Sequence, residues 1–190
     1  MESRARRSRD VSDAIAEPVS VPAGAGATES FEALYMRTFR RVYAYVASMV
    51  GDRQAAEDVT ALAFERAYRR RRRFTASRGT PDAWIFGIAR NAALDELRRR
   101  RRRARLQGEP EDPWCADPDE ELQLALRRET VRAALATLDP RERDLIALRF
   151  AGGLSHSDIA RALGISESNA GTRLHRTIEK LRKACDDTDP

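Results

Sequence analysis

The chain has 190 residues, of which 42% are hydrophobic, 34% charged and 6% aromatic, and its length and net charge of +5 fit one or two small globular domains. No apolar run approaches the roughly 20 residues that cross a bilayer, and no apolar core follows the arginine-rich N-terminus, so we expect a cytoplasmic protein without membrane insertion. Two cysteines, Cys115 and Cys185, are too few for a disulfide framework and too far apart for a zinc site, so no metal or other cofactor is expected.

The N-terminal part of the chain begins with a segment that has no periodic pattern. Residues 1–28 are rich in Arg, Ser, Ala, Pro and Gly, which predicts a disordered tail. From Phe31, apolar side chains recur at steps of three and four residues until Gly51, a spacing typical of an amphipathic helix. The first folded element is therefore predicted to be a helix that ends at Gly51.

Two more helices are predicted to complete an N-terminal bundle. Asp52 is a suitable N-cap for a helix that runs into the arginines of residues 69–73. After a loop, Thr80 is suited to cap a third helix with Pro81 in its first turn, where the missing N–H costs nothing, and this helix ends in six consecutive arginines. Because no tract alternates with period two, residues 29–105 are predicted to be all-α.

A linker separates this bundle from a second one. Between residues 106 and 118, one glycine and three prolines interrupt helical continuation and their neighbours are acidic, which predicts a flexible acidic linker. Asp139 followed by Pro140 is a helix-start signal in the part that follows. Residues 119–185 are therefore predicted to form a second small helical domain, and residues 186–190 an acidic tail.

The second domain contains a helix-turn-helix pattern. Ser155 is suited to cap a short helix, Gly164 to supply the left-handed residue of a turn, and Ser166 to cap the next helix. A helix laid into the major groove of DNA needs short polar groups at its N-terminal end and arginines further along. The outward positions of the second helix carry such side chains, namely Ser168, Asn169, Thr172, Arg173 and Arg176.

The competing interpretation of this tract is an ordinary helical hairpin with solvated charges. The distribution of charge favours DNA, because residues 30–103 hold 18 basic and 8 acidic side chains and residues 127–185 hold 12 and 7. Between them, residues 106–126 hold seven acids and no base, so two basic bodies are joined by an acidic segment. Gly171 does not fit the predicted second helix well, because a glycine inside a helix destabilises it by about 1 kcal/mol relative to alanine.

Four stretches, taken in order, resemble the extracytoplasmic-function (ECF) subfamily of bacterial RNA polymerase sigma factors. The first two resemble the polymerase-docking and promoter-melting helices of region two, and the last two resemble region four. Together they span about 31–184, and the combination is far more specific than any one piece. They are AEDV at 56–59 with Phe64, WIFGIARN at 84–91 with Asp95 and Arg98, LDPRER at 138–143, and the helix-turn-helix tract at 154–176.

The resemblance implies a protein that is not an enzyme but binds core RNA polymerase and directs promoter-specific initiation. Region two, residues 29–105, would grip the clamp of the largest subunit through Asp58 and Phe64 and would recognise and melt the -10 element. Region four, residues 119–185, would bind the -35 element of promoter DNA with its helix-turn-helix and contact the polymerase flap. Many relatives are held inactive by an anti-sigma factor between the two regions, so such a factor is a candidate partner.

A melted strand needs positive charge and platforms for its extruded bases. Large aromatic side chains also dominate small cores, so the two aromatic residues among our candidates have a second interpretation as core residues. Asp95 lies one turn before Arg98 and is placed to orient it. The candidates for the -10 strand are Phe74, Gly79, Thr80, Trp84, Asn91 and Arg98.

Two positions depart from the family pattern. Ala61 stands where many relatives have glutamine, so the usual polar polymerase contact is missing there, and Gly171 stands where a basic residue is frequent. The alternative function is a stand-alone helix-turn-helix regulator that binds duplex DNA as a dimer. A recombinase or nuclease ranks last, because no nucleophile or carboxylate cluster is apparent in the sequence.

Overall fold

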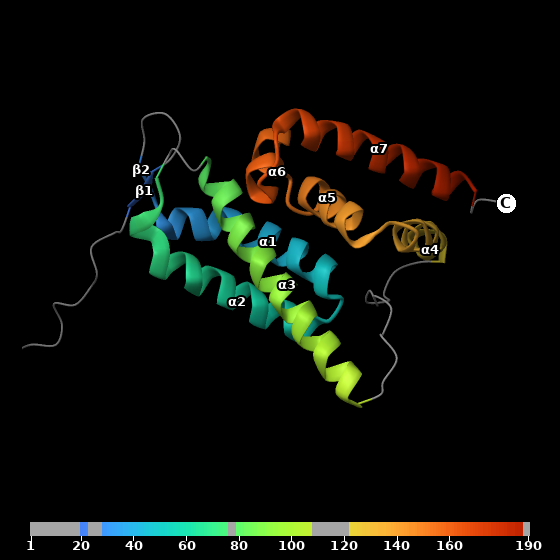
Figure 1. Cartoon of the computed structure of the whole chain (residues 1–190), viewed down its shortest axis with the longest axis horizontal. Helices are drawn as coiled ribbons and strands as arrows, with labels where there is room; N and C mark the ends of the chain where they lie inside the picture. The colour runs from blue at the N-terminus through green and yellow to red at the C-terminus, as the bar shows by residue number, and fades with distance from the viewer. Residues whose placement is uncertain (1–19, 23–27, 76–78, 108–121, 188–190) are drawn as a thin grey trace, which may run out of the picture.

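The computed structural model describes residues 20–22, 28–75, 79–107 and 122–187 of the chain. These residues form seven α-helices, one 3-10 turn and one pair of short strands, and they confirm the predicted fold class of two small helical domains (Figure 1). The elements are β1 (Ser20–Pro22), β2 (Thr28–Ser30), α1 (Phe31–Val50), α2 (Arg53–Arg70), η2 (Arg71–Arg73), α3 (Pro81–Gln107), α4 (Leu122–Ala136), α5 (Pro140–Phe150), α6 (His156–Leu163) and α7 (Glu167–Asp186).

Helices α1, α2 and α3 form the N-terminal bundle, and local sequence decides where they begin. The side chain of Asp52 accepts a hydrogen bond of 2.6 Å from a backbone N–H in the first turn of α2, and Thr80 accepts one of 3.1 Å in α3. Gly51 ends α1 in the left-handed conformation with a φ of 67°, which glycine adopts without steric cost. The two predicted caps and the predicted end of the first helix are therefore confirmed.

A short antiparallel pair of strands precedes α1, with Ser20 opposite Ser30. The sequence predicts no strand, and it assigns residues 1–28 to a disordered tail, whereas the described part of that tail belongs to this pair. Three-residue strands are too short to show an alternating pattern, which is why the sequence does not reveal them. Glu29 accepts hydrogen bonds of 3.0 and 3.1 Å from Arg37, and this pairing ties β2 to α1.

Helices α4 to α7 form the C-terminal bundle. Asp139 and Glu142 form a capping box at the start of α5, and the N–H of Glu142 donates to the Asp139 carboxylate, which lowers the pKa of that carboxyl group. Ser155 caps α6 and Ser166 caps α7. Gly164 has a φ of 68° in the turn between them, so the predicted helix-turn-helix is confirmed.

The N-terminal bundle ends slightly later than the sequence predicts. Helix α3 continues to Gln107, two residues beyond the predicted domain end at 105, because residues 105–107 contain no Gly or Pro and the next helix-breaking residue is Gly108. The rest of the predicted linker, residues 108–118, lies outside the described residues.

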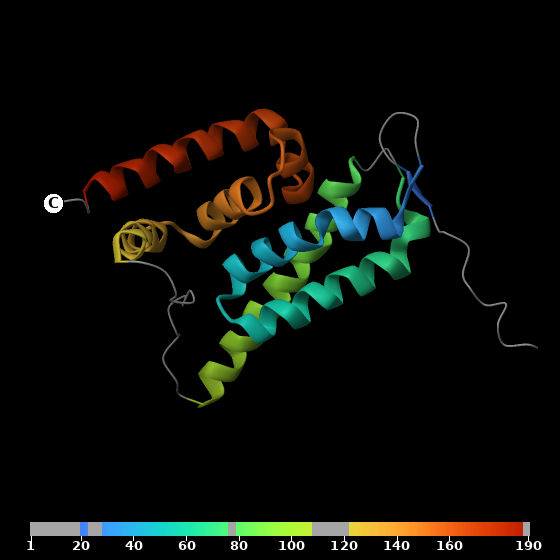
Figure 2. The same cartoon turned by 180° about the vertical axis from the view of Figure 1, so that it is seen from behind.

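The two bundles pack closely against each other. Helix α3 lies beside α6 and α1 beside α5, as Figures 1 and 2 show from opposite sides. Buried apolar side chains of both bundles belong to one continuous core, which includes Tyr45 and Phe86 of the N-terminal bundle and Leu148 and Ile159 of the C-terminal one. Within the described ranges, no helix has the length and apolar character of a membrane span.

Candidate nucleic-acid interface

The outward face of α7 carries all five side chains expected from the helix-turn-helix pattern. Its opposite face is anchored by Ala170 and Leu174, which are buried against α6 and the rest of the core. Arg173 and Arg176 form no ion pair with any acidic side chain in the described part of the chain, so both guanidinium groups are available to an external anion. The exposed set is Ser168, Asn169, Thr172, Arg173 and Arg176.

Gly171 lies on α7 between these residues and is not required by packing. A methyl group at this position would meet nothing closer than the His156 ring, at 4.0 Å. Among the described residues, no backbone from outside the helix approaches Gly171, so the glycine leaves an open position on the face of the helix.

We expect the Gly171→Ala variant to be more stable than the wild type by about 1 kcal/mol, because alanine favours the helix and space for its methyl group exists. Urea denaturation followed by circular dichroism measures this difference. Gly87→Ala in α3 is a useful comparison, because a methyl group there would also meet no atom within 4 Å. A loss of stability in Gly171→Ala would contradict the conclusion that a methyl group fits at this position without a clash.

The two aromatic residues proposed to meet extruded bases differ in exposure. Phe74 is 4% exposed, and its ring lies 5.0 Å from that of Trp84, centroid to centroid. Trp84 is only partly buried. The core interpretation therefore holds for Phe74, which supports the Trp84 ring from within the bundle, and Trp84 is the aromatic surface of the pair.

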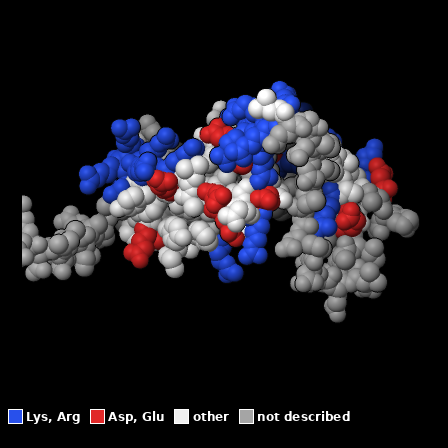
Figure 3. All heavy atoms as spheres, turned by 90° about the horizontal axis from the view of Figure 1, so that it is seen from below, with Lys and Arg blue, Asp and Glu red and all other residues white. Residues whose placement is uncertain are grey.

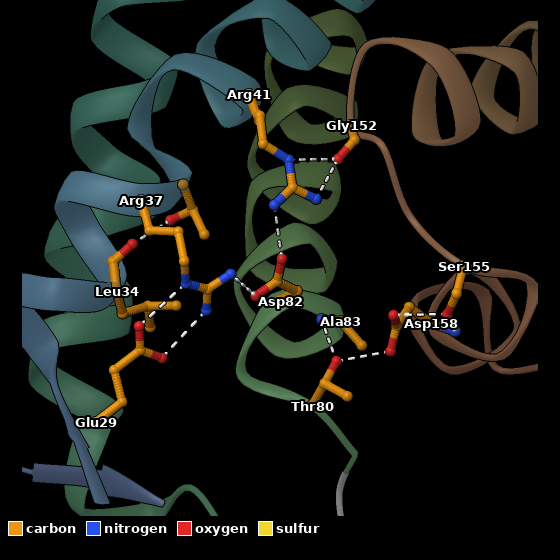
Figure 4. A network of polar contacts seen from close by, with 11 residues as sticks. Glu29, Leu34, Arg37, Arg41, Thr80, Asp82, Ala83, Gly152, Ser155 and Asp158 are labelled. Atoms are coloured by element: carbon orange, nitrogen blue, oxygen red, sulfur yellow. Dashed lines mark hydrogen bonds and ion pairs between the residues drawn. The ribbon is translucent and has the colours of Figure 1, made fainter. Parts of the chain in front are cut away.

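The start of α3 brings two further candidates against the C-terminal bundle (Figure 4). The Thr80 hydroxyl, which caps α3, donates a hydrogen bond of 2.6 Å to Asp158 of α6. Gly79 has a φ of 105°, and a methyl group there would overlap the Arg161 side chain. Both candidates therefore lie at the contact between the bundles.

The remaining two candidates lie farther along α3 and face solvent. Asn91 and Arg98 are both exposed. Arg98 donates a hydrogen bond of 3.0 Å to Asp95, the pairing that the sequence predicts, and Asp95 also lies 3.6 Å from Arg66 of α2. The carboxylate thus fixes the direction of the Arg98 guanidinium on the surface.

The two residues predicted to bind polymerase do not share a surface. Asp58 is exposed on α2 and lies within hydrogen-bond distance of Gln54, at 3.4 Å. Phe64 is 5% exposed, and its ring packs against Tyr35 at 4.8 Å and Phe39 at 5.9 Å. Phe64 is therefore a core residue in this structure, and of the two only Asp58 can meet a partner.

The sequence pattern also misses an exposed apolar strip on α1. We use this name for Tyr35, Met36 and Phe39, which are 37%, 73% and 37% exposed. The periodicity assigns Tyr35 and Phe39 to the buried face of the helix. The sequence carries no clear signal for the strip, because two neighbouring large apolar residues of a helix can both be buried, as Ile85 and Phe86 are in α3.

The arginine run at residues 98–103 is partly neutralised by the chain itself. Glu96 is 7% exposed and accepts ion pairs from Arg99 and, at 3.1 Å, from Arg100, which also lies 3.2 Å from Asp52. Like charges at this spacing repel one another, and these internal carboxylates supply part of the negative charge that offsets the repulsion. Figure 3 shows Lys and Arg side chains at several places on one face, with acidic side chains among them.

Across the part of the chain that the structure describes, no group of three or more His, Cys, Asp or Glu side chains is arranged to hold a metal ion. The chemistry available is that of exposed arginine, amide, hydroxyl and aromatic groups, which suits phosphates and base edges.

Comparison with known proteins gives a consistent result for both bundles. Residues 34–103 match the family model described as Sigma-70 region 2, and residues 128–181 match Sigma-70, region 4. The chain is 36% identical over 162 residues to RNA polymerase sigma factor CarQ of Myxococcus xanthus, covering 83% of this chain and 90% of CarQ. It is 32% identical over 162 residues to ECF RNA polymerase sigma factor SigX of Bacillus subtilis, covering 82% and 83%.

Another relative and two solved structures extend this similarity. The chain is 32% identical over 168 residues to ECF RNA polymerase sigma factor BldN of Streptomyces coelicolor and spans 64% of that protein's length. The sigma factor RpoE of Bartonella quintana, solved with the anti-sigma factor NepR, has a TM-score of 0.68 at 23% identity, covering 82% of this chain and 96% of RpoE. CnrH, solved with the cytosolic domain of CnrY, has a TM-score of 0.61 at 22% identity, covering 84% and 89%.

Proposed function

This chain belongs to the extracytoplasmic-function sigma factors of bacterial RNA polymerase, and on that premise we propose how its side chains divide the work of promoter recognition. As a sigma factor, it directs promoter-specific initiation by core RNA polymerase. We call residues 29–105 region two and residues 119–185 region four. The observation that carries the residue-level proposal is the exposed face of α7, where Arg173 and Arg176 have no acidic partner among the described residues.

Region four binds the -35 element through α7 in this proposal. Ser168, Asn169 and Thr172 lie at the N-terminal half of the helix, where a recognition helix meets base edges. Arg173 and Arg176 lie further along the helix and meet phosphates or guanine edges. The open position at Gly171 leaves the major-groove face without a side chain at that point.

Region two opens the -10 element and holds one melted strand along α3. Trp84 supplies the stacking surface, and Asn91 and Arg98 supply exposed polar groups about two turns apart on the same helix. Thr80 and Gly79 complete this face at the start of the helix. Phe74 acts indirectly, because its buried ring supports that of Trp84.

Region two also docks on core polymerase, and Asp58 is the residue that we assign to this contact. The side chain is exposed on the outer face of α2, where Leu62 follows one turn later and is 36% exposed. Position 61 on the same helix is Ala61 and therefore offers no glutamine side chain to the polymerase. Asp58 thus supplies the polar contact on this surface. We propose no catalytic activity for the protein itself, since the chemistry of RNA synthesis belongs to the polymerase.

Run-off transcription with purified core polymerase tests the proposed function. The template is a library of upstream regions from the same genome, and the expected result is a discrete promoter-dependent transcript that requires the protein. The absence of any such transcript across the library would contradict the proposal. A stable dimer that footprints a two-fold symmetric site without polymerase would instead support a stand-alone regulator.

Asp58→Ala is expected to weaken binding to core polymerase about tenfold or more, because the interface loses a charged group that the free protein leaves exposed. Fluorescence titration of labelled protein with core polymerase measures the change. Glu57→Ala is the matched control, since Glu57 is also exposed on α2 but pairs with Arg53 at 3.1 Å. Equal losses in both variants would argue against a specific role for Asp58.

An anti-sigma factor is a further partner that we propose from family membership. Among solved structures of this fold, RpoE was obtained in complex with the anti-sigma factor NepR. Co-purification of the full chain with a candidate inhibitor from its own genome, followed by loss of run-off transcription, tests this partner. Transcription that is unaffected by a stoichiometric complex would contradict it.

A further inference from the structure

The pair of short strands before α1 lies beside the part of region two that carries the -10 candidates. We call this pair, residues 20–22 and 28–30, the brace. One of its strands, β1, contacts η2, and the other, β2, runs directly into α1 (Figure 1). The match to Sigma-70 region 2 begins at residue 34, so the family model does not account for the brace.

Glu29 of the brace is linked to the start of α3 through Arg37 of α1 (Figure 4). Arg37 donates hydrogen bonds of 3.0 and 3.1 Å to the two carboxylate oxygens of Glu29 and forms an ion pair of 2.5 Å with Asp82. The carboxylates of Glu29 and Asp82 are 17% and 16% exposed, so solvent screens them only partly. Because a guanidinium is a rigid planar fork, the two bonds to Glu29 fix the direction of the third nitrogen toward Asp82.

Asp82 in turn holds the first turn of α3 against α1. One of its carboxylate oxygens pairs with Arg37, and the other accepts a hydrogen bond of 2.8 Å from Arg41. Its negative charge also lies at the positive end of the α3 dipole, where it stabilises the helix start. In the same turn, the Thr80 hydroxyl accepts from a backbone N–H at 3.1 Å, and the Thr80 carbonyl accepts from the Trp84 N–H at 3.1 Å. The placement of Thr80 and Trp84 therefore depends on Asp82 and its two arginines.

A second connection runs from the brace to Trp84 through η2. The ring of Phe31, the residue that follows the brace, packs on Tyr68 at 5.3 Å, and the Arg71 guanidinium lies 3.6 Å from the centroid of the Tyr68 ring. Arg71 also donates a hydrogen bond of 2.6 Å to the Tyr68 carbonyl, and its own carbonyl accepts one of 3.2 Å from the N–H of Phe74. Since Phe74 supports the Trp84 ring, the two connections converge on Trp84.

Binding of a melted strand is sensitive to such placement. Ordering protein groups at the moment of binding costs free energy, so groups that are already placed bind more tightly than mobile ones. Glu29 is the only brace side chain among the described residues that forms an ion pair with α1, and Arg37 passes this contact on to α3. The brace thus has one charged link through which it can act on the -10 face.

We propose that the brace is a positioning element for opening of the -10 element and that Arg37 is its positioning residue. Glu29 orients Arg37, and Arg37 holds Asp82 so that Thr80 and Trp84 are in place when the melted strand arrives. Arg37 itself does not touch the strand. The role in melting rests on the proposed function, whereas the effect of the brace on the start of α3 does not.

Hydrogen exchange followed by mass spectrometry on the full chain tests the effect on α3. Glu29→Ala is expected to raise the exchange rate of a peptide that contains Ala83 and Trp84 about threefold or more, because the amides of both residues are bonded in the first turn of α3. A peptide from α7 should exchange as in the wild type. An unchanged rate at the start of α3 would overturn the proposal. If Glu29→Ala does not fold, Glu29→Gln, which keeps the length of the side chain, decides.

Glu32→Ala is the matched control for Glu29→Ala. Glu32 is exposed in the first turn of α1, so its replacement makes the same change in net charge three residues away. The control is expected to leave exchange at the start of α3 unchanged. An equal rise in both variants would overturn the specific link through Arg37, because a general change in charge would then explain the effect.

The kinetics of promoter opening by holoenzyme test the role in function. Time courses of thymine reactivity to permanganate at several holoenzyme concentrations separate the affinity of the first, closed complex from the rate of opening. Glu29→Ala and Arg37→Met are expected to lower the rate of opening about three- to tenfold and to leave the affinity of the closed complex unchanged, because the placed groups act only on the separated strand. A protein that is merely less stable would lower the amount of active holoenzyme rather than this rate.

The double variant of Glu29→Ala and Arg37→Met tests the order of the contacts. It is expected to open the promoter no more slowly than Arg37→Met alone, because Glu29 acts through Arg37. Additive losses, or an opening rate equal to that of the wild type in both single variants, would overturn the proposal. If the wild-type holoenzyme opens no promoter, the proposed function fails, while hydrogen exchange still decides whether the brace holds the start of α3.

Discussion

Replacing Arg173 and Arg176 together with glutamate is expected to lower affinity for -35 duplex DNA at least about 100-fold, because withdrawing one arginine from a phosphate or base edge costs roughly 1–3 kcal/mol. Both side chains are exposed on α7, and neither has an acidic partner in the described ranges, so the change removes no internal ion pair. Fluorescence anisotropy with a labelled promoter duplex at several salt concentrations measures the affinity. The slope of affinity against salt is expected to become shallower by about one for each phosphate that the variant no longer neutralises.

A control variant with the same change in net charge distinguishes the loss of direct DNA contacts from a general electrostatic effect on DNA binding. Arg182 and Lys183 lie near the C-terminal end of α7, away from the proposed base-contacting half, and are also exposed. Replacing these two with glutamate is expected to change -35 affinity by less than about tenfold at physiological salt. Binding of the Arg173 and Arg176 variant to core polymerase should stay unchanged. Equal loss of DNA and polymerase binding in that variant would contradict the role assigned to α7.

Phe64→Ala is expected to destabilise the protein by about 3–5 kcal/mol, the usual cost of truncating a buried phenylalanine. Phe64 is 5% exposed and packs against the rings of Tyr35 and Phe39, so its loss leaves a cavity in the N-terminal bundle. Because domains of this size are stable by only about 5–15 kcal/mol, this change alone brings region two close to unfolding. Urea denaturation measures the loss.

Leu62→Ala on the same helix is the control for Phe64→Ala. Leu62 is 36% exposed, and its truncation is expected to cost less than about 1 kcal/mol. A Phe64→Ala protein with wild-type stability but weakened polymerase binding would show that Phe64 contacts the polymerase, as the family resemblance implies. The expected pattern is the reverse, with stability lost at Phe64 and polymerase affinity lost at Asp58.

The sequence predicts local features of the fold well, because local chemistry decides them. The Asp52 and Ser166 caps each act within one turn of their own helix, and Gly164 supplies the left-handed residue that its turn requires. The five outward residues of α7 follow from helical spacing once that cap is placed. Each of these features depends on residues only a few positions apart.

Features that depend on distant neighbours could not be predicted in the same way. Phe64 lies inside α2, and Phe74 directly follows η2. Only the position of the neighbouring helix decides whether such an aromatic ring is buried in the core or exposed on the surface. Asp144 of region four accepts hydrogen bonds from Tyr45, 99 residues earlier, and from Arg90, 54 residues earlier. No spacing rule connects residues so far apart, so the contact between the regions becomes visible only in the folded chain.

Promoter opening by reconstituted holoenzyme measures the division of labour between the two regions most directly. Permanganate reactivity of thymines reports melting at -10, and footprinting in the same reaction reports occupancy at -35. We predict that Asn91→Ala combined with Arg98→Ala lowers thymine reactivity at least about tenfold while -35 protection remains, since these exposed side chains meet the melted strand. Loss of -35 protection with undiminished thymine reactivity in that variant would contradict the assignment of melting to region two.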